Sequence, residues 1–458
     1  MKYPRSQVHS KAHALPELRF EDQTLTSFAG LVIFQKFFAS INLKSRLRRC
    51  FEPRRPGKVF HPATVFLQLI VHLLLGFREL QDGRYYRDDP LVQRLLGLRR
   101  LPTVTTVSRA LKQATAQSVE ALRGFLRERV LDGLRTFQPT RVTLDFDGSV
   151  LSTQRRAEGT AVGFNKKKKG ARSYYPLFCT IAQTAQVLDF LFRPGNVHDS
   201  QGAEAFILAC IEAVRGVLPN AQIEIRMDSA FFSDAIITAL TRQGVEFTIS
   251  VPFERFVELK RMIEQRRRWR RVDDETCYFE TSWKPQCWDR RFRFVFIRTR
   301  AKKQHKGPIQ LDLFVPYEYG YEFKVIVTNK TVRAKRVAAF HEGRGSQEGV
   351  FAELKSHCHL DYVPVRTLYG NQTYLLAGLF AYNLTKELQM QTAPRTRGTT
   401  AKRTCLWVFE KVGTLRQTLL HRAGRLSRPQ GLLTLTISAN AWVKTRLLHI
   451  LNQIPANV

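Results

Sequence analysis

Between residues 141 and 251, short apolar strands alternate with amphipathic helices, and this order constrains the fold more than any other feature of the sequence. Strands are expected near 141–147, 174–182, 186–192, 223–227 and 246–251, with helices near 200–214 and 234–241. The strand segments alternate every second residue or form short apolar runs, whereas the helical segments repeat every three or four residues. Three strands, a helix, a strand, a helix and a strand predict an α/β fold whose first three strands are antiparallel.

This order is the one found in an RNase H-like core, and the segments around it have a different character. We expect five segments: an α-helical DNA-binding and dimerisation region at 1–138, the first part of the core at 139–252, a β-rich basic insertion at 253–330, the second part of the core at 331–395, and a basic C-terminal region at 396–458. The insertion includes a basic helix at 260–271, and a long helix at 334–358 follows it.

The charge balance points to a polyanionic partner. The chain has 73 Lys and Arg residues against 39 Asp and Glu residues, a formal net charge of +34 in 458 residues. Apolar residues make up 44% of the sequence, which is enough for folded cores. A folded protein this basic associates with nucleic acid, and a ribosomal or membrane-surface partner is the alternative.

Cysteine usage and hydropathy indicate the cell compartment. The seven cysteines are scattered and form no CxxC pair, which favours reduced thiols over a disulfide framework or a structural zinc site. The longest apolar stretch, at 64–77, is too short to span a bilayer, and the N-terminus lacks the apolar run of a signal peptide. We therefore expect a soluble cytoplasmic protein without a membrane partner.

Three basic segments are candidates for DNA contacts. They are the loop Lys166, Lys167, Lys168 and Lys169, the cluster Arg267, Arg268 and Arg270 around Trp269, and the helix after Thr103 that carries Arg109. Arginines beside a tryptophan suit phosphates and a stacked base, although such a cluster is also found on solvated faces. The helix with Arg109 could be the second helix of a helix-turn-helix or equally a capped surface helix.

Two aspartates follow strands that the fold places side by side. Asp147 ends the first strand, and Asp228 directly follows the strand 223–227. The first and fourth strands are neighbours in an RNase H-like sheet, so the two carboxylates are expected at one edge. An Asp after a strand also commonly caps the next turn. Asp145 lies on the same face as Asp147 and is a supporting candidate.

The helix near 334–358 supplies a third carboxylate. His341, Arg344, Glu348 and Lys355 follow one another at helical spacing and form one stripe. Arg344 and Glu348 could be an exposed ion pair, which is the commoner meaning of such spacing. The stripe gains significance because the two strand-end aspartates are expected opposite it.

These motifs together resemble a known family. The chain resembles bacterial insertion-sequence transposases with a DDE catalytic core and a Tyr-Arg-Glu-Lys helix signature, and more narrowly the transposase DDE group 1 family, relatives of the piggyBac-type enzymes. The matching segments are Leu144-Asp145-Phe146-Asp147-Gly148-Ser149, Arg193-Pro194-Gly195-Asn196-Val197-His198, Arg226-Met227-Asp228-Ser229, Phe351-Ala352-Glu353-Leu354-Lys355 and Ala381-Tyr382-Asn383-Leu384.

The resemblance implies specific roles. It makes Asp147, Asp228 and Glu348 the catalytic metal ligands and Arg344 and Lys355 phosphate contacts, while His341 stands where the family signature has tyrosine. Two Mg²⁺ ions, for which Mn²⁺ can substitute, would support cleavage at transposon ends and 3′-OH strand transfer. The implied partners are double-stranded DNA (terminal inverted repeats and target) and a second copy of the chain, in a bacterial cytoplasm at the nucleoid.

Two other functions remain open at this stage. An RNase H-like nuclease could cut without joining, and a domesticated transposase could bind DNA without catalysis. The loss of an acidic residue would mark the second, yet all three carboxylates are present. A ribosomal or RNA-binding protein would explain the charge but not the three carboxylates.

Overall fold

A nine-stranded mixed sheet organises the computed structural model, which describes residues 17–19, 21, 23–52, 60–153, 156–163, 165, 168–198, 200–301 and 320–455. In spatial order the strands are β7 (Gln186–Leu191), β6 (Leu177–Ile181), β2 (Arg141–Gly148), β8 (Gln222–Met227), β9 (Glu246–Ser250), β13 (Tyr321–Thr328), β12 (Phe292–Arg300), β11 (Thr276–Trp283) and β10 (Arg270–Arg271). The chain is therefore a mixed α/β protein with one large sheet.

The strand order expected between residues 141 and 251 is present. β2, β6 and β7 are antiparallel neighbours, while β8 pairs in parallel with β2 and β9 pairs in parallel with β8. The segment 253–330 is rich in strands, as expected, and these strands extend the same sheet. β13 pairs antiparallel with β9, so the outer edge of β9 is covered and does not present open backbone groups to solvent.

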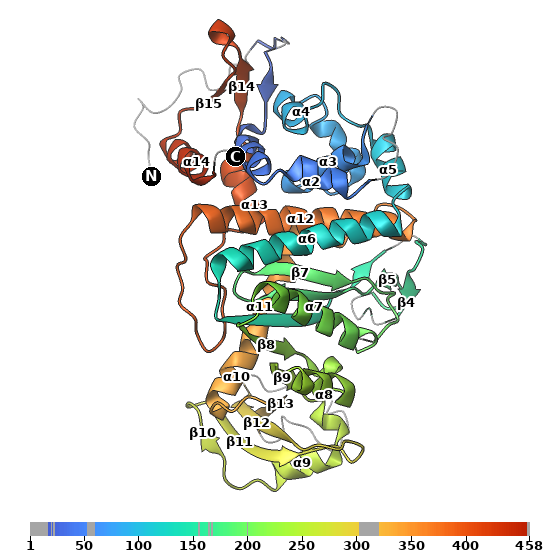
Figure 1. Cartoon of the computed structure of the whole chain (residues 1–458), viewed down its shortest axis with the longest axis vertical. Helices are drawn as coiled ribbons and strands as arrows, with labels where there is room; N and C mark the ends of the chain where they lie inside the picture. Colours follow the sequence, from blue (N-terminus) through green and yellow to red (C-terminus); the bar gives the residue numbers. More distant parts are fainter. Residues whose placement is uncertain are drawn as a thin grey trace.

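Helices cover both faces of the sheet because its strands carry apolar side chains on both sides. Along β6, Leu177 and Cys179 enter one hydrophobic core and Phe178 enters the other, as the pleat requires. The first core includes residues of α7 (Ala203–Val217), α8 (Asp234–Arg242) and α9 (Val257–Glu264), and the second includes residues of α6 (Ala116–Phe137), α11 (Ser346–His357) and α12 (Leu368–Thr392). Figure 1 shows α6 and α12 lying side by side along the sheet.

The N-terminal and C-terminal regions form one helical lobe on the far side of α12 (Figure 1). The lobe contains α1 (Val32–Ser40), α2 (Leu43–Arg49), α3 (Pro62–Leu74), α4 (Pro90–Leu96), α5 (Val104–Lys112), α13 (Val412–Leu415) and α14 (Ala441–Gln453). A small sheet joins β1 (Leu25–Thr26) to β14 (Gly424–Ser427) and β15 (Thr434–Ile437). The C-terminal region therefore packs on the body of the protein.

Three short strands lie beyond the end of β2. They are β3 (Leu151–Ser152), β4 (Ala161–Val162) and β5 (Arg172–Tyr174), and they form a separate small sheet.

Across the described ranges, no helix has both the length and the apolar content that a bilayer crossing requires.

A buried carboxylate on β8 holds distant segments together. Glu224 has no exposed side-chain surface, and its oxygens lie 2.7 Å from Arg403, 2.8 Å from Lys330 and 3.1 Å from Arg141. Burial alone would raise the pKa of Glu224, but Arg403 and Lys330 lower it to about 2. Glu224 therefore links β8 to the start of β2, the end of β13 and the C-terminal region.

Because of this cluster, the free energy of unfolding is expected to fall at acid pH, and this fall is the acid limb of the stability profile. The folded pKa of Glu224 is depressed from 4.5 to about 2, so its contribution is complete above pH 4.5 and is lost as the pH falls through 2. The contribution is about 3 kcal/mol by linkage. We expect Glu224→Gln to lower the free energy of unfolding at pH 7 and to reduce its fall between pH 5 and 2. Urea unfolding followed by tryptophan fluorescence measures both, and an unchanged acid limb would contradict the role of Glu224.

Candidate active site

Asp147 and Asp228 meet at the carboxyl edge of the sheet. The parallel register of β2 and β8 ends with Phe146 beside Met227, so the two aspartates are the next residues on neighbouring strands. Asp147 has a side chain 21% exposed, and its Oδ1 accepts a hydrogen bond from the Gly148 amide at 2.8 Å. Asp228 Oδ1 accepts from the Ala230 amide at 3.0 Å, so this aspartate also caps the short turn after β8. The two carboxylates therefore share one edge while each is fixed locally.

Asp145 has a different environment from Asp147, although they share a face of β2. Its side chain is 1% exposed and makes two hydrogen bonds to Arg226, at 2.6 Å from Nε and 2.7 Å from Nη2. Arg226 is itself fully buried and donates from Nη1 to the carbonyl oxygens of Phe340 and Lys402. The interpretation of Asp145 as a supporting metal ligand is not favoured, because both of its carboxylate oxygens are engaged by Arg226.

The helix expected at 334–358 is divided. It consists of α10 (Ala334–Glu342), a tight 3₁₀ turn at Gly343–Gly345 and α11. A β-carbon on Gly343 would lie 1.9 Å from the Lys402 carbonyl oxygen and 2.1 Å from Arg226 Nη1. Only glycine allows the backbone to approach Arg226 this closely. The 3₁₀ turn has three residues per turn, so the single stripe expected from a continuous α-helix is not maintained across it.

The turn brings Arg344 and Glu348 to the edge of the sheet. Arg344 Nη1 lies 3.3 Å from Asp147 Oδ2, and Gln347 Nε2 donates to the carbonyl oxygen of Asp145 at 3.0 Å. Glu348 follows Gln347 directly and its side chain is exposed. The other glutamate of this helix, Glu353, is buried against Lys386 and accepts from the Val412 amide. Glu348 therefore remains the candidate third carboxylate.

The structure corrects the expected position of His341 on an exposed helix stripe beside the DNA. Its side chain is 1% exposed, with Nε2 2.8 Å from Ser250 Oγ and Nδ1 3.0 Å from Thr248 Oγ1. Burial lowers its pKa well below 6.5, and the nearby cations Lys324 and Arg344 lower it further. In this structure His341 connects α10 to β9 and does not reach a surface where DNA could bind.

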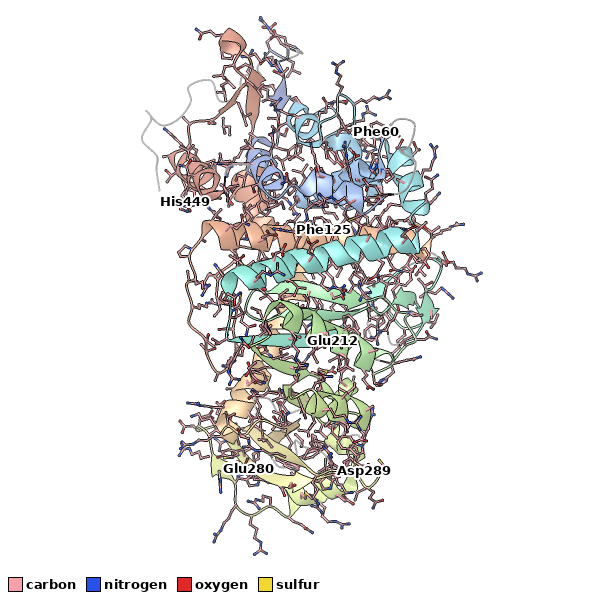
Figure 2. The ribbon with its side chains drawn as sticks, viewed as in Figure 1. Phe60, Phe125, Glu212, Glu280, Asp289 and His449 are labelled. Carbon is pink, nitrogen blue, oxygen red and sulfur yellow. The ribbon has the colours of Figure 1, made fainter. Side chains whose placement is uncertain are left out.

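The other basic candidates are distributed over several elements of the structure. Arg109 on α5, Lys168 and Lys169 before β5, and Arg267, Arg268 and Arg270 are exposed, whereas Lys355 on α11 is half-buried. Lys166 and Lys167 lie outside the described residues. Figure 2 shows nitrogen-ended side chains projecting from the lobe that carries Glu280 and Asp289.

The basic cluster around Trp269 also differs from its expected form. Helix α9 ends at Glu264, so the expected basic helix to Arg271 is shorter, and β10 begins at Arg270. Trp269 packs edge-on against Phe279 with ring centroids 4.7 Å apart, and the Arg298 guanidinium lies 4.6 Å from the Trp269 ring. The expected base-stacking role of Trp269 is not favoured, because its ring is half-buried against β11.

The donors at the sheet edge suit a hard divalent cation, but they are not closed around one. Carboxylate oxygens are the ligands that Mg²⁺ and Mn²⁺ prefer. Asp147 and Asp228 supply such oxygens on adjacent strands. In the part of the chain that the structure describes, no group of three acidic, histidine or cysteine side chains converges closely enough to hold a metal ion. The residue types therefore fit a metal site, with Glu348 as the member that has to approach.

Comparison with known families decides the identity. The family described as transposase DDE domain group 1 matches residues 10–457. The chain belongs to this family. It is therefore a transposase, an enzyme that acts on DNA.

Two solved structures are distant matches to this transposase. The piggyBac transposase synaptic complex with hairpin DNA is 12% identical with a TM-score of 0.41, over 85% of this chain and 79% of that one. A Mos1 transposase paired-end complex with the left transposon end is 14% identical with a TM-score of 0.18, over 43% of this chain and 60% of that one. A comparison with curated proteins gave no match. The assignment rests on the family match, because these structural likenesses are too remote to support further conclusions.

Three residues of the transposase site were missed by sequence reasoning. They are Arg226, Gln347 and Gly343, which position the carboxylates and do not replace them. Arg226 pairs in register with Asp145 on the neighbouring strand, and this pairing of opposite charges was a signal available once the strands were aligned. The contacts of Gln347 and Gly343 depend on tertiary packing and left no comparable pattern.

The buried Asp145–Arg226 pair is expected to stabilise the folded protein, whereas the partly exposed Asp147 carboxylate is not. Arg226→Met leaves the Asp145 carboxylate buried without its partner, and breaking such a pair typically costs about 3–5 kcal/mol. We expect a corresponding loss in the free energy of urea unfolding. Asp147→Asn, at a partly exposed carboxylate, is the control and should change stability by less than about 1 kcal/mol. Equal losses in the two variants would contradict the positioning role of Asp145 and Arg226.

Proposed function

We propose that the transposase cleaves DNA at transposon ends and joins the freed 3′-OH to target DNA in a cut-and-paste reaction. The observation that carries the proposal is that Asp147 and Asp228 are adjacent at two parallel strand ends. Arg344, in the 3₁₀ turn before α11, lies 3.3 Å from Asp147. The strand order β7-β6-β2-β8-β9 supports an RNase H-like core, with β10–β13 as its β-rich extension.

Asp147, Asp228 and Glu348 would hold divalent metal ions, which we propose are two Mg²⁺ ions replaceable by Mn²⁺. When bound, such ions activate the attacking oxygen and stabilise the leaving oxygen of an in-line phosphoryl transfer. The role of the protein is to place the carboxylates: β2 and β8 fix two of them, and the Gln347 contact to the Asp145 carbonyl fixes the helix that carries the third.

We propose that Arg344 contacts the reacting phosphate in addition to Asp147. Its guanidinium contacts the Asp147 carboxylate at 3.3 Å and is 21% exposed, so it can remain beside the reacting phosphate. A guanidinium there offsets the negative charge of the phosphoryl oxygens. Lys355, which follows Glu348 on α11, is proposed to contact the DNA backbone near the same edge.

The remaining basic segments are proposed to hold DNA away from the cut. The α-helical region up to residue 138, with Arg109, would bind terminal inverted repeats, and the exposed arginines around β10 would bind flanking or target DNA through phosphates. A homodimer would pair two transposon ends. We propose that the functional segments are residues 1–138, 139–252, 253–330, 331–395 and 396–458, as the sequence predicts.

Two rival functions give different results in one assay. A nuclease without joining activity would release the 3′-OH and form no strand-transfer product. A domesticated DNA-binding protein would bind the repeats and leave them intact. Retention of all three carboxylates in the sequence, two of them on adjacent strand ends, favours catalysis over simple binding.

The proposal predicts that the three carboxylates are essential. With labelled DNA that carries the element's own terminal repeat, wild-type protein should nick the repeat boundary in Mg²⁺ and not in EDTA. Asp228→Asn and Glu348→Gln should each reduce this cleavage at least about 100-fold, because a metal-holding carboxylate is removed. Glu212→Gln, on α7 at the opposite face of the sheet, is the matched control and should cleave normally. Full activity in either site variant would rule out the assigned site.

A further inference from the structure

Lys324 on β13 lies at the same edge of the sheet as the two aspartates. Val327 pairs with Ile249 of β9, and Ile249 pairs with Met227 of β8. β13 runs antiparallel to β9, so its N-terminal residues extend past the edge where β2, β8 and β9 end. The Val325 carbonyl still accepts from the Val251 amide at 2.9 Å. Lys324 is the next residue beyond that contact.

Lys324 also projects from the same face as the aspartates. Residues paired across neighbouring strands share a face, and the face alternates along each strand. Ile326 pairs with Ser250, which is in line with Asp228 because Ile249 pairs with Met227. Lys324 is two residues from Ile326 and therefore returns to this face. From the strand spacing and rise, its backbone lies roughly 12 Å from that of Asp228.

A basic pocket opens between Lys324 and the residue after Asp228. It has a volume of about 340 Å³, and its charged and hydroxyl lining residues are Ser229, Ser250, Glu254, Arg255 and Lys324, together with residues 251–253 after β9 and the β13 residues Phe323 and Val325. Arg255 and Lys324 are exposed, and the hydroxyl of Ser250 is hydrogen-bonded to the buried His341. Two cations, one carboxylate and Ser229 therefore line this pocket, and Ser229 directly follows Asp228 in the chain.

Charges of both signs lie near Lys324. Partial desolvation of its ammonium group lowers its pKa, and nearby Arg344 lowers it further, while Glu342 acts in the opposite direction. Glu342 is itself paired with Lys402 at 3.0 Å. Neighbouring cations repel one another until an anion binds between them, so an arrangement of this kind favours a phosphate.

We propose that Lys324 binds a backbone phosphate one or two nucleotides from the bond that is cut, on the β13 side of the site. The cut strand would cross the ends of β2, β8 and β9 and continue over the pocket formed by Ser229, Arg255 and Lys324. This inference rests on the proposed function, because it assumes that DNA is cut at the Asp147–Asp228 edge. It assigns to the segment 253–330 a direct part in positioning the substrate.

The test uses terminal-repeat DNA in which one phosphate at a time is made a neutral methylphosphonate, within three nucleotides on either side of the boundary. We expect Lys324→Met to weaken binding of unmodified DNA about five- to tenfold and to lower the slope of log affinity against log salt by about one. One methylphosphonate position should weaken wild-type binding by a similar factor and leave Lys324→Met binding unchanged. Lys324→Arg should retain most of the affinity.

Controls separate this inference from folding and from the proposed function. Lys335→Met removes an equal charge from an exposed lysine of α10, whose Nζ bonds the Val272 carbonyl; it should retain the position-specific methylphosphonate effect. A Lys324→Met protein that shows the same position-specific effect as wild type overturns the inference. Binding is measured in EDTA and cleavage in Mg²⁺, so a wild-type protein that binds with the Lys324-dependent effect but never cuts refutes the proposed function alone.

Discussion

The buried ion pair between Asp145 and Arg226 is the interaction on which the arrangement of the site depends. Two charges removed from water are tolerated only when hydrogen bonds satisfy them. Here both Asp145 oxygens accept from Arg226, and Arg226 also donates to the carbonyl oxygens of Phe340 and Lys402. The pair joins β2 to β8 two residues before Asp147 and Asp228 on their strands. Arg226 also holds the carbonyl at the end of α10, so the same guanidinium fixes both strands and the helix that carries Glu348.

Around this pair, the polar face of the sheet is arranged in rows. Glu224 and its cations form one row, Asp145 and Arg226 the next, and the two catalytic candidates lie at the solvent-facing end. The carboxylates become more exposed from row to row, from Glu224 with no exposed side-chain surface through Asp145 at 1% to Asp147 at 21%. The inner rows supply rigidity, because their charges are satisfied within the protein. The outer row remains open to water and to substrate.

The sequence predicted the strands and the strand-end aspartates because those features depend on local periodicity and on neighbouring strands. It predicted the wrong environment for His341 and an unbroken helix, since a single 3₁₀ turn at Gly343 changes the phase of every residue that follows. That turn exists because Gly343 packs against Arg226 and Lys402, and such a contact between segments remote in sequence has no periodic signature. Trp269 was misjudged for a related reason, because a half-buried ring and an exposed ring have the same local sequence.

The bond from Arg226 to the Lys402 carbonyl sets an order of events during synthesis of the protein. All three catalytic candidates leave the ribosome before residue 402 does, yet Arg226 then lacks one of its carbonyl partners and Glu224 lacks Arg403. A nascent chain therefore carries its nuclease residues for some time without the support that aligns them. The carboxylates are therefore held in their final arrangement only once the segment at residues 402–403 has been made and has packed against Arg226 and Glu224.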